Sequence, residues 1–155
     1  MCVSSYNKRL VLELVKSSRM QNGLRHGDYL RYRQYCARRL RRIRKSLKFM
    51  HGKGKQFLNK KVDVETATCT EYGYPWPVCP RLLLNLKCRF LFIPLFNAER
   101  AWSFAMQLRE DEKNDKEEYG EDGNSRIKFH LASRLAKAAF WSKQLLDLCT
   151  ARADA

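Results

Sequence analysis

The sequence predicts an all-α protein in which antiparallel helical hairpins are interrupted by an irregular, proline-rich insert. Apolar residues recur at three- and four-residue intervals over several long stretches, which is the spacing of one face of an α-helix. Only a short glycine-containing turn separates the first two of these stretches, so the two helices are predicted to lie antiparallel. A middle stretch carries three prolines in six residues, Pro75 to Pro80, and is compatible with neither regular helix nor interior strand.

The first predicted helix precedes Gly23, a residue suited to the left-handed conformation that often ends a helix. Ser4 and Ser5 are residues that can cap its N-terminus. After the turn Gly23–Gly27, Asp28 is a good N-cap for the second helix. The predicted apolar face of the first helix consists of Leu10, Val11, Leu14 and Val15.

The second predicted helix runs from Asp28 to Met50, and Gly52 and Gly54 are expected to end it. Its apolar residues follow steps of 4, 4, 3, 4 and 3, so they share one side that should face a protein core. These residues are Tyr32, Cys36, Leu40, Ile43, Leu47 and Met50.

Positive charge dominates the rest of this second helix. Nine of its 23 residues are Arg or Lys, and its only acid is Asp28. At about 100° per residue, one group of cations lies opposite the apolar side: Arg31, Arg38, Arg41, Arg42 and Lys45. A second group flanks the apolar side, where long stems can cover apolar surface while the charged heads extend outward: Arg33, Arg39, Arg44 and Lys48. Like charges at these spacings repel one another in isolation, so the pattern indicates an anionic partner such as a phosphate backbone.

Two further helices are predicted in the second half of the chain. Leu82 to Phe96 is compatible with helix or strand, and a clear helical pattern begins at Leu95. Residues 110–123 are charged and contain glycine, which predicts a flexible acidic loop. The side of the third helix is formed by Ala98, Trp102, Ala105 and Leu108 or Arg109. Asn124 or Ser125 can cap the last helix, whose apolar stripe is Ile127, Leu131, Leu135, Ala138, Trp141 or Ser142, Leu145 and Leu148.

The charge of the chain is unevenly distributed. The net charge is +15, while Arg25 to Lys61 holds fourteen Lys or Arg against one Asp, a balance of +13. Glu110 to Asp122 holds eight acids against two Lys, a balance of −6. The surplus in one segment predicts a localised anionic partner rather than a generally cationic protein.

Other classes of protein receive little support. Met1 to Met20 has no long apolar run, so no signal peptide is expected and the six cysteines are predicted to be reduced thiols. Neither the cysteines nor the histidines show zinc-ligand spacing, so no metal is expected. The sequence has no glycine-rich phosphate loop and no paired nucleophile and base, so neither an enzyme nor a cofactor is expected. Leu82 to Phe96 is too short and too charged for direct membrane insertion.

Three motifs, in one order, resemble the N-terminal RNA-binding domain of the sixty-eight kilodalton subunit of the signal recognition particle. The first is the turn Gly23–Asp28 with the Tyr- and Arg-rich residues up to Lys45, the second is Asn97–Leu108, and the third is Lys128–Leu135. The matched parts together cover Leu10 to Lys61 and Arg89 to Cys149. The resemblance identifies the chain, residues 1–155, as a single partial RNA-binding domain with a tetratricopeptide-like helical fold.

The resemblance also implies a function. The family domain binds the RNA of the particle near a junction of RNA helices and sets an arginine-rich helix into an RNA groove. The full subunit acts beside the seventy-two kilodalton subunit, and the particle directs ribosomes that display signal sequences to its receptor at the endoplasmic reticulum. The family places such a protein in the cytoplasm, with assembly in the nucleolus. The predicted RNA-binding residues are Arg25, Arg31, Arg33, Arg38, Arg39, Arg41, Arg42, Arg44, Lys45 and Lys48.

The chain departs from the family pattern over Thr70 to Lys87, which has no recognisable counterpart. This insert is either a lineage-specific loop or intronic sequence carried into the gene product, and its unusual composition favours the second. The chain also stops at Ala155, short of the family regions thought to hold the seventy-two kilodalton subunit.

Several alternatives stay open at this level. The basic side could be a solvated surface, or the helix could bind calmodulin or a membrane surface, although bulky apolar anchors are missing from its middle. A general basic RNA- or ribosome-binding protein is the second functional hypothesis. Tyr32 and Tyr35 could stack on bases, but packing against a neighbouring helix is preferred. His26 could reach a phosphate or shape the turn. Trp102 and Trp141 are expected in the core. Glu99 and Arg100 are interpreted as a pair on the helix surface.

Overall fold

A computed structural model of the chain describes residues 3–53, 56–57, 62, 80–119 and 125–153. Over these residues the fold is all-α, as predicted, with four long helices packed as hairpins and one very short pair of antiparallel strands. The elements in order are α1 (Val3–Gln21), the short 3-10 helix η1 (Leu24–His26), α2 (Tyr29–Ser46), β1 (Gly52–Lys53), β2 (Gln56–Phe57), α4 (Pro80–Tyr119) and α5 (Ser125–Ala153).

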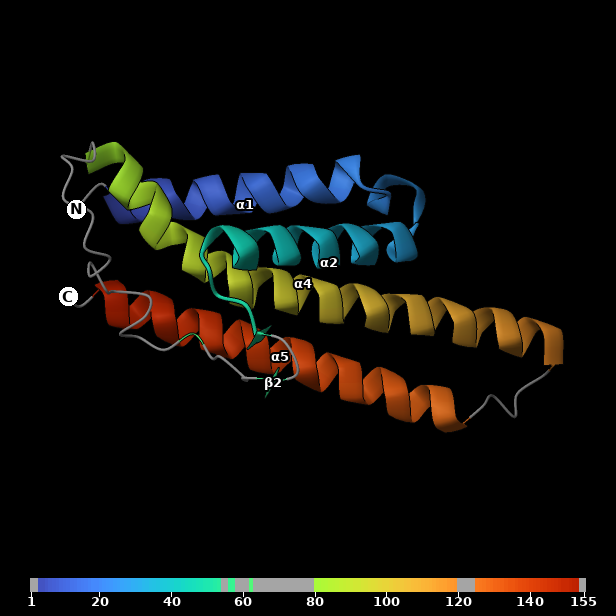
Figure 1. Ribbon diagram of the computed structural model, residues 1–155. Helices are drawn as coiled ribbons and strands as arrows, with labels where there is room; N and C mark the ends of the chain where they lie inside the picture. The colour runs from blue at the N-terminus through green and yellow to red at the C-terminus, as the bar shows by residue number, and fades with distance from the viewer. Residues whose placement is uncertain (1–2, 54–55, 58–61, 63–79, 120–124, 154–155) are drawn as a thin grey trace.

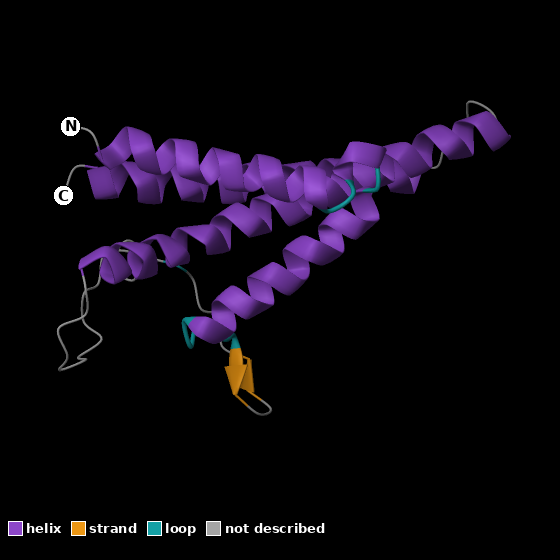
Figure 2. Cartoon of the chain, turned by 90° about the horizontal axis from the view of Figure 1, so that it is seen from above, coloured by secondary structure: helices purple, strands orange, loops and turns teal. Residues whose placement is uncertain are grey.

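The four helices are arranged around α4, which packs against both α2 and α5. α1 and α2 are joined by the short turn and run back in opposite directions, diverging toward the C-terminal end of α2 (Figure 2), and α4 and α5 form the second pair (Figure 1). α4 packs along α2 on one side and along α5 on the other, and residues of all three helices join in one core. The strand pair, in which Gly52 lies opposite Phe57, projects beyond the C-terminal end of α2 (Figure 2).

The turn between α1 and α2 follows the sequence prediction. Gly23 and Gly27 both have left-handed backbones, with φ of 108° and 73°. The carbonyl of Gly23 accepts hydrogen bonds from the amides of His26 and Asp28. The Asp28 carboxylate accepts a hydrogen bond of 2.8 Å from the backbone N–H of Arg31 and so caps α2. The capping prediction for α1 was wrong, because α1 begins at Val3, before Ser4 and Ser5.

Replacement of Gly23 by Ala is expected to destabilise the protein by about 1–3 kcal/mol or more. A Cβ at Gly23 would lie 2.9 Å from the Asp28 carbonyl oxygen, and the backbone at φ 108° disfavours any side chain. Urea unfolding followed by far-UV circular dichroism measures the loss. Gly27→Ala is the matched control, because its φ is also positive but its Cβ would meet nothing closer than Glu110 Oε1 at 4.0 Å. Equal losses for the two variants would contradict this account.

α2 ends at Ser46, earlier than the predicted end near Gly52. Lys48 takes a left-handed backbone with φ of 52°, and the amides of Lys48 and Phe49 bond back to the carbonyls of Lys45 and Arg44 at 3.2 and 2.8 Å. This is the Schellman arrangement that commonly ends helices. Phe49 then packs edge-on against Phe90 of α4, with ring centroids 5.8 Å apart. The helix therefore stops where an aromatic contact turns the chain back to the core.

The core confirms the predicted apolar side of α2. Its buried members include Tyr32 and Cys36, both fully enclosed, and Leu40, Ile43 and Leu47. Met50 was predicted to belong to this series, but it follows the early end of α2 and is 43% exposed. The partners of the α2 side are Val62, Ile93 and Phe96 and, from α5, Leu148.

α4 corrects two predictions about irregular segments. Residues 80–87 of the predicted insert are helical, and 70–79 lie outside the described residues. Residues 110–119 of the predicted acidic loop are also helical, because Glu and Lys are good helix formers and the first glycine comes only at Gly120. Leu82 to Phe96 is helix rather than strand. α4 bends in its N-terminal part (Figure 1), and Pro94 inside the helix accounts for a bend there, because it lacks an amide hydrogen.

α5 begins at Ser125 and presents nearly the predicted stripe. Ala138 and Leu148 are buried, while Leu135 is 38% exposed and Arg134 takes its place as the half-buried residue.

On α4, Ala98, Ala101 and Ala105 are buried, as expected of small residues at close helix contacts. Within the described part of the chain, no helix has the length and apolar character needed to cross a membrane.

Candidate nucleic-acid interface

The five cations predicted to lie opposite the apolar side of α2 are all exposed: Arg31, Arg38, Arg41, Arg42 and Lys45. Among the described residues, no carboxylate lies within ion-pair distance of any of them. Asp28 approaches only the backbone of Arg31. Within the described structure, this side of the helix therefore carries positive charge that no carboxylate compensates, which is the electrostatic condition for binding a polyanion.

The flanking cations have different surroundings. Arg33 and Arg39 are half-buried, and the Arg33 guanidinium lies 4.3 Å from the centroid of the Phe104 ring. Arg25 in the turn is exposed, as is Lys48, which lies beyond the end of α2. Arg33 and Arg39 lie on α2 beside its apolar side, as predicted, whereas Lys48 follows the end of the helix.

Arg44 was predicted to extend its charged head outward, and this geometry was wrong. The residue is only 8% exposed, and its Nε and Nη1 atoms are buried with no hydrogen-bond partner in the described structure. Burial, and then the positive charge of Arg100, lower the pKa of the Arg44 guanidinium. The side chain packs toward α4 and α5 because its helical position lies beside Ile43 and Leu40 rather than opposite them.

A buried network fixes the position of α2. Glu99 of α4 accepts two hydrogen bonds from Arg19 of α1, at 2.7 and 2.9 Å, and one of 2.8 Å from the hydroxyl of Tyr32 in α2. Burial raises the pKa of Tyr32, and the carboxylate of Glu99 adds to the shift. The predicted surface pair of Glu99 with Arg100 was therefore wrong, since Glu99 is 9% exposed and joins three helices.

The aromatic residues near α2 serve packing. Tyr32 is fully buried, and the ring of Tyr35 stacks on it with centroids 6.1 Å apart, so the preferred packing role is confirmed for Tyr32. Trp102 packs against the core and receives the guanidinium of Arg19 at 4.7 Å from its ring centroid.

Trp141 was expected in the core, but it is only half-buried and faces a groove instead. His26 is exposed in the turn.

Burial raises the pKa of the Cys36 thiol to about 12, so this thiol stays protonated at neutral pH. A protonated, fully enclosed thiol is a poor nucleophile and a poor metal ligand. Among the described residues, no group of three or more His, Cys, Asp and Glu is placed to hold a metal ion. Cys36 therefore acts as a small apolar residue of the core.

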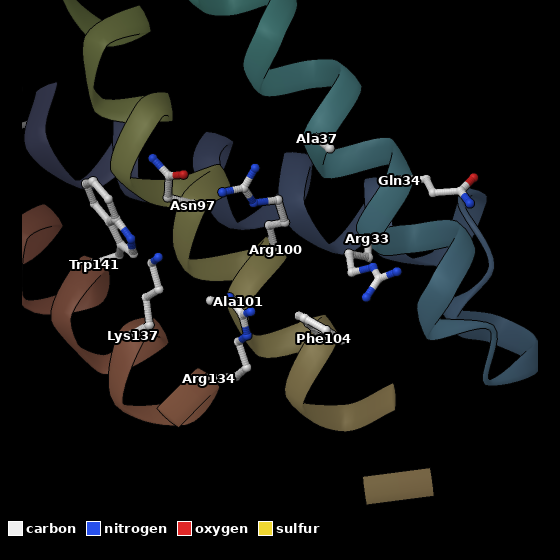
Figure 3. Close-up of a pocket in the computed structure, with 10 residues that line it drawn as sticks. All are labelled: Arg33, Gln34, Ala37, Asn97, Arg100, Ala101, Phe104, Arg134, Lys137 and Trp141. Atoms are coloured by element: carbon white, nitrogen blue, oxygen red, sulfur yellow. The ribbon is translucent and has the colours of Figure 1, made fainter. Parts of the chain in front are cut away.

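Sequence reasoning missed a second set of cations that the fold brings beside α2. Arg100 of α4 and Arg134 and Lys137 of α5 lie across a groove from Arg33 and Ala37 of α2 (Figure 3). Partial burial, and then the charge of Arg134, lower the pKa of Arg100. Arg134 gave one signal in the sequence, because it falls within the helical arc of the apolar stripe. The packing of α5 against α4, which the sequence did not predict in detail, was needed to place it.

The fold and the site define a class: a helical module that presents a basic helix, with cations from two neighbouring helices beside it, to a polyanion. Residues 24–155 match the family model described as RNA-binding signal recognition particle 68, and the chain belongs to this family. The family is that of a particle subunit rather than of an enzyme, in agreement with the prediction.

Curated relatives agree with the family match. The chain is 36% identical over 143 residues, 92% of its length, to signal recognition particle subunit SRP68 of Drosophila melanogaster. It is 37% identical over 144 residues, 93% of its length, to the subunit of the same name from Dictyostelium discoideum. It is 32% identical over 141 residues, 87% of its length, to that of Caenorhabditis elegans. The chain spans about a fifth of the length of these relatives.

Proposed function

We propose that this chain binds the RNA of the signal recognition particle through the exposed cations of α2. The observation that carries the proposal is that the exposed cations of this helix have no carboxylate partner among the described residues, in a member of an RNA-binding family. The opposite side of α2 is anchored in the core, so the exposed side is held outward on a rigid support. An arginine-rich helix of this kind contacts phosphates on both sides of a groove that it enters.

The proposed role is that of a scaffold without catalytic chemistry. Within the full subunit, the RNA-binding module would support the targeting of signal-sequence proteins to the endoplasmic reticulum during translation. The seventy-two kilodalton subunit would contact regions outside this chain, and the ribosome and the receptor would be reached indirectly through the particle. We assign the cytoplasm as its location, with assembly in the nucleolus, and a tetratricopeptide-like arrangement to its helical pairs. These assignments rest on the family.

A competition experiment tests the proposal. The particle RNA with its helix junction competes against a plain duplex of equal length for the purified chain at physiological salt. We expect a preference of at least about tenfold, or about 1.4 kcal/mol, for the particle RNA. Equal binding that fades with added salt would instead support the second hypothesis, a general basic RNA- or ribosome-binding protein. Counterion release makes that second kind of binding weaken steeply with salt and leaves it indifferent to RNA shape.

A further inference from the structure

The groove between α2 and α5, floored by α4, holds two adjoining cavities of about 300 and 710 Å³. Such volumes fall within the range of roughly 300–1,000 Å³ that accommodates small ligands. Asn97, Arg100, Lys137 and Trp141 line both cavities, so the two share a wall; Figure 3 shows these residues around the smaller cavity. Within the described residues the lining includes no carboxylate, and the site therefore selects for negative charge.

Two buried side chains point to a ligand that accepts hydrogen bonds. Asn97 is 4% exposed, and its Nδ2 donor has no partner among the described residues. Arg44 is 8% exposed, and both its Nε and Nη1 donors also lack partners there. Both residues line the larger cavity. Buried donors without partners are costly and uncommon in folded proteins, so phosphate or carbonyl oxygens of a ligand would satisfy them.

The same cavity also offers an acceptor and an aromatic ring. The Nε2 atom of Gln144 donates to the carbonyl of Val62 at 3.3 Å, which leaves its buried Oε1 acceptor without a partner in the described structure. The ring of Phe104 is already covered by the guanidinium groups of Arg33 and Arg134, at 4.3 and 4.6 Å from its centroid. Trp141 is the half-buried aromatic residue that lines both cavities. Donor, acceptor and stacking surface together match a nucleobase as well as a phosphate.

We propose that this groove receives one unpaired nucleotide of the bound RNA, with its phosphate between Arg44, Arg100 and Lys137 and its base against Trp141. The inference rests on the proposed RNA-binding function, and it adds a subsite for a nucleotide outside the duplex. Arg41 belongs both to the exposed side of α2 and to the lining of the larger cavity. A strand that follows the exposed side of α2 thus passes the mouth of the groove.

Three RNA hairpins that differ at one stem position test the subsite. One carries a single unpaired adenosine, one an abasic residue at the same place, and one is fully paired. Binding to the full chain is measured by fluorescence anisotropy at constant salt. We expect the hairpin with the unpaired adenosine to bind roughly tenfold more tightly than the other two, because neither of them offers a free base to stack on an aromatic ring. Trp141→Leu should remove this preference, and Trp141→Phe, which keeps a stacking ring, should retain most of it.

Matched variants and a competitor separate the possible failures. Arg38→Gln, on the exposed side of α2 away from the groove lining, should weaken binding of all three hairpins equally. Equal binding of the three hairpins to the wild type, or a preference that survives Trp141→Leu, would overturn the nucleotide subsite and leave the proposed function standing. Failure of every hairpin to bind would overturn the nucleotide subsite, and the competition with the particle RNA and its junction would then decide the proposed function by itself. Tight, Trp141-dependent binding of free adenosine monophosphate would assign the groove to a free nucleotide instead of RNA.

Discussion

Charge reversal of four exposed residues of α2 abolishes RNA binding and leaves the helix content unchanged: this is the expected result for the combined variant Arg38→Glu, Arg41→Glu, Arg42→Glu and Lys45→Glu. All four side chains are exposed and outside the core, so their replacement removes no packing. The affinity is expected to fall roughly a thousandfold or more, because favourable phosphate interactions become repulsive. The salt dependence of residual binding should fall by about one unit of slope for each phosphate that the variant no longer neutralises.

A control variant with the same change of net charge separates position from total charge. It carries four Lys-to-Glu replacements at exposed positions outside α2: Lys16, Lys113, Lys128 and Lys143. This variant should keep most of its affinity if α2 is the interface. Similar losses for the two variants would show that binding follows only net charge.

In contrast, Leu40→Asp and Ile43→Asp place charges in the core and should unfold the domain.

Removal of the Glu99 carboxylate should strongly reduce the stability of the protein without placing a charge in its core. Glu99→Ala is expected to lower the free energy of unfolding by about 3–5 kcal/mol, the range found when one partner of a buried ion pair is removed. Tyr32 is fully enclosed, so its hydroxyl loses its acceptor and cannot reach water. The Arg19 side chain is 39% exposed and can regain water, which places the loss toward the lower end of the range.

Urea unfolding, followed by circular dichroism, measures this loss against two other variants. Glu13→Ala, an exposed acid on α1, is the control and should change stability by less than about 0.5 kcal/mol. Tyr32→Phe removes only the buried donor and should cost about 1 kcal/mol. A loss for Glu99→Ala no larger than that of Glu13→Ala would show that the network does not hold the three helices together.

The sequence predicted well those features that depend on helical spacing. The series from Tyr32 to Leu47 is buried and the cations opposite it are exposed, because both follow from the rotation per residue of a single helix. The cap at Asp28 and the left-handed Gly23 were also predicted, since turn chemistry is local. The roles of the exposed cations in RNA binding stay predictions.

Features that depend on packing between helices could not be predicted in the same way. The early end of α2 depends on the contact of Phe49 with Phe90, forty-one positions away in sequence. Glu99 looked like a surface residue because its partners, Arg19 and Tyr32, lie on two other helices. The cations that line the groove could be recognised only once α5 was placed against α4. The helical nature of residues 110–119, in contrast, could have been found locally, from the high helix propensity of Glu and Lys.

The central place of α4 has a mechanical consequence. α2 is tied to α4 through Glu99 and the core, and α5 packs along the other side of α4, so the basic groups of α2 and α5 stand at a fixed separation. Under the proposed function, an RNA whose width matches this separation would bind with little loss of protein conformational entropy. An RNA of a different width must deform itself to bind. Discrimination would then come from the stiffness of the helical scaffold, even where no base is read.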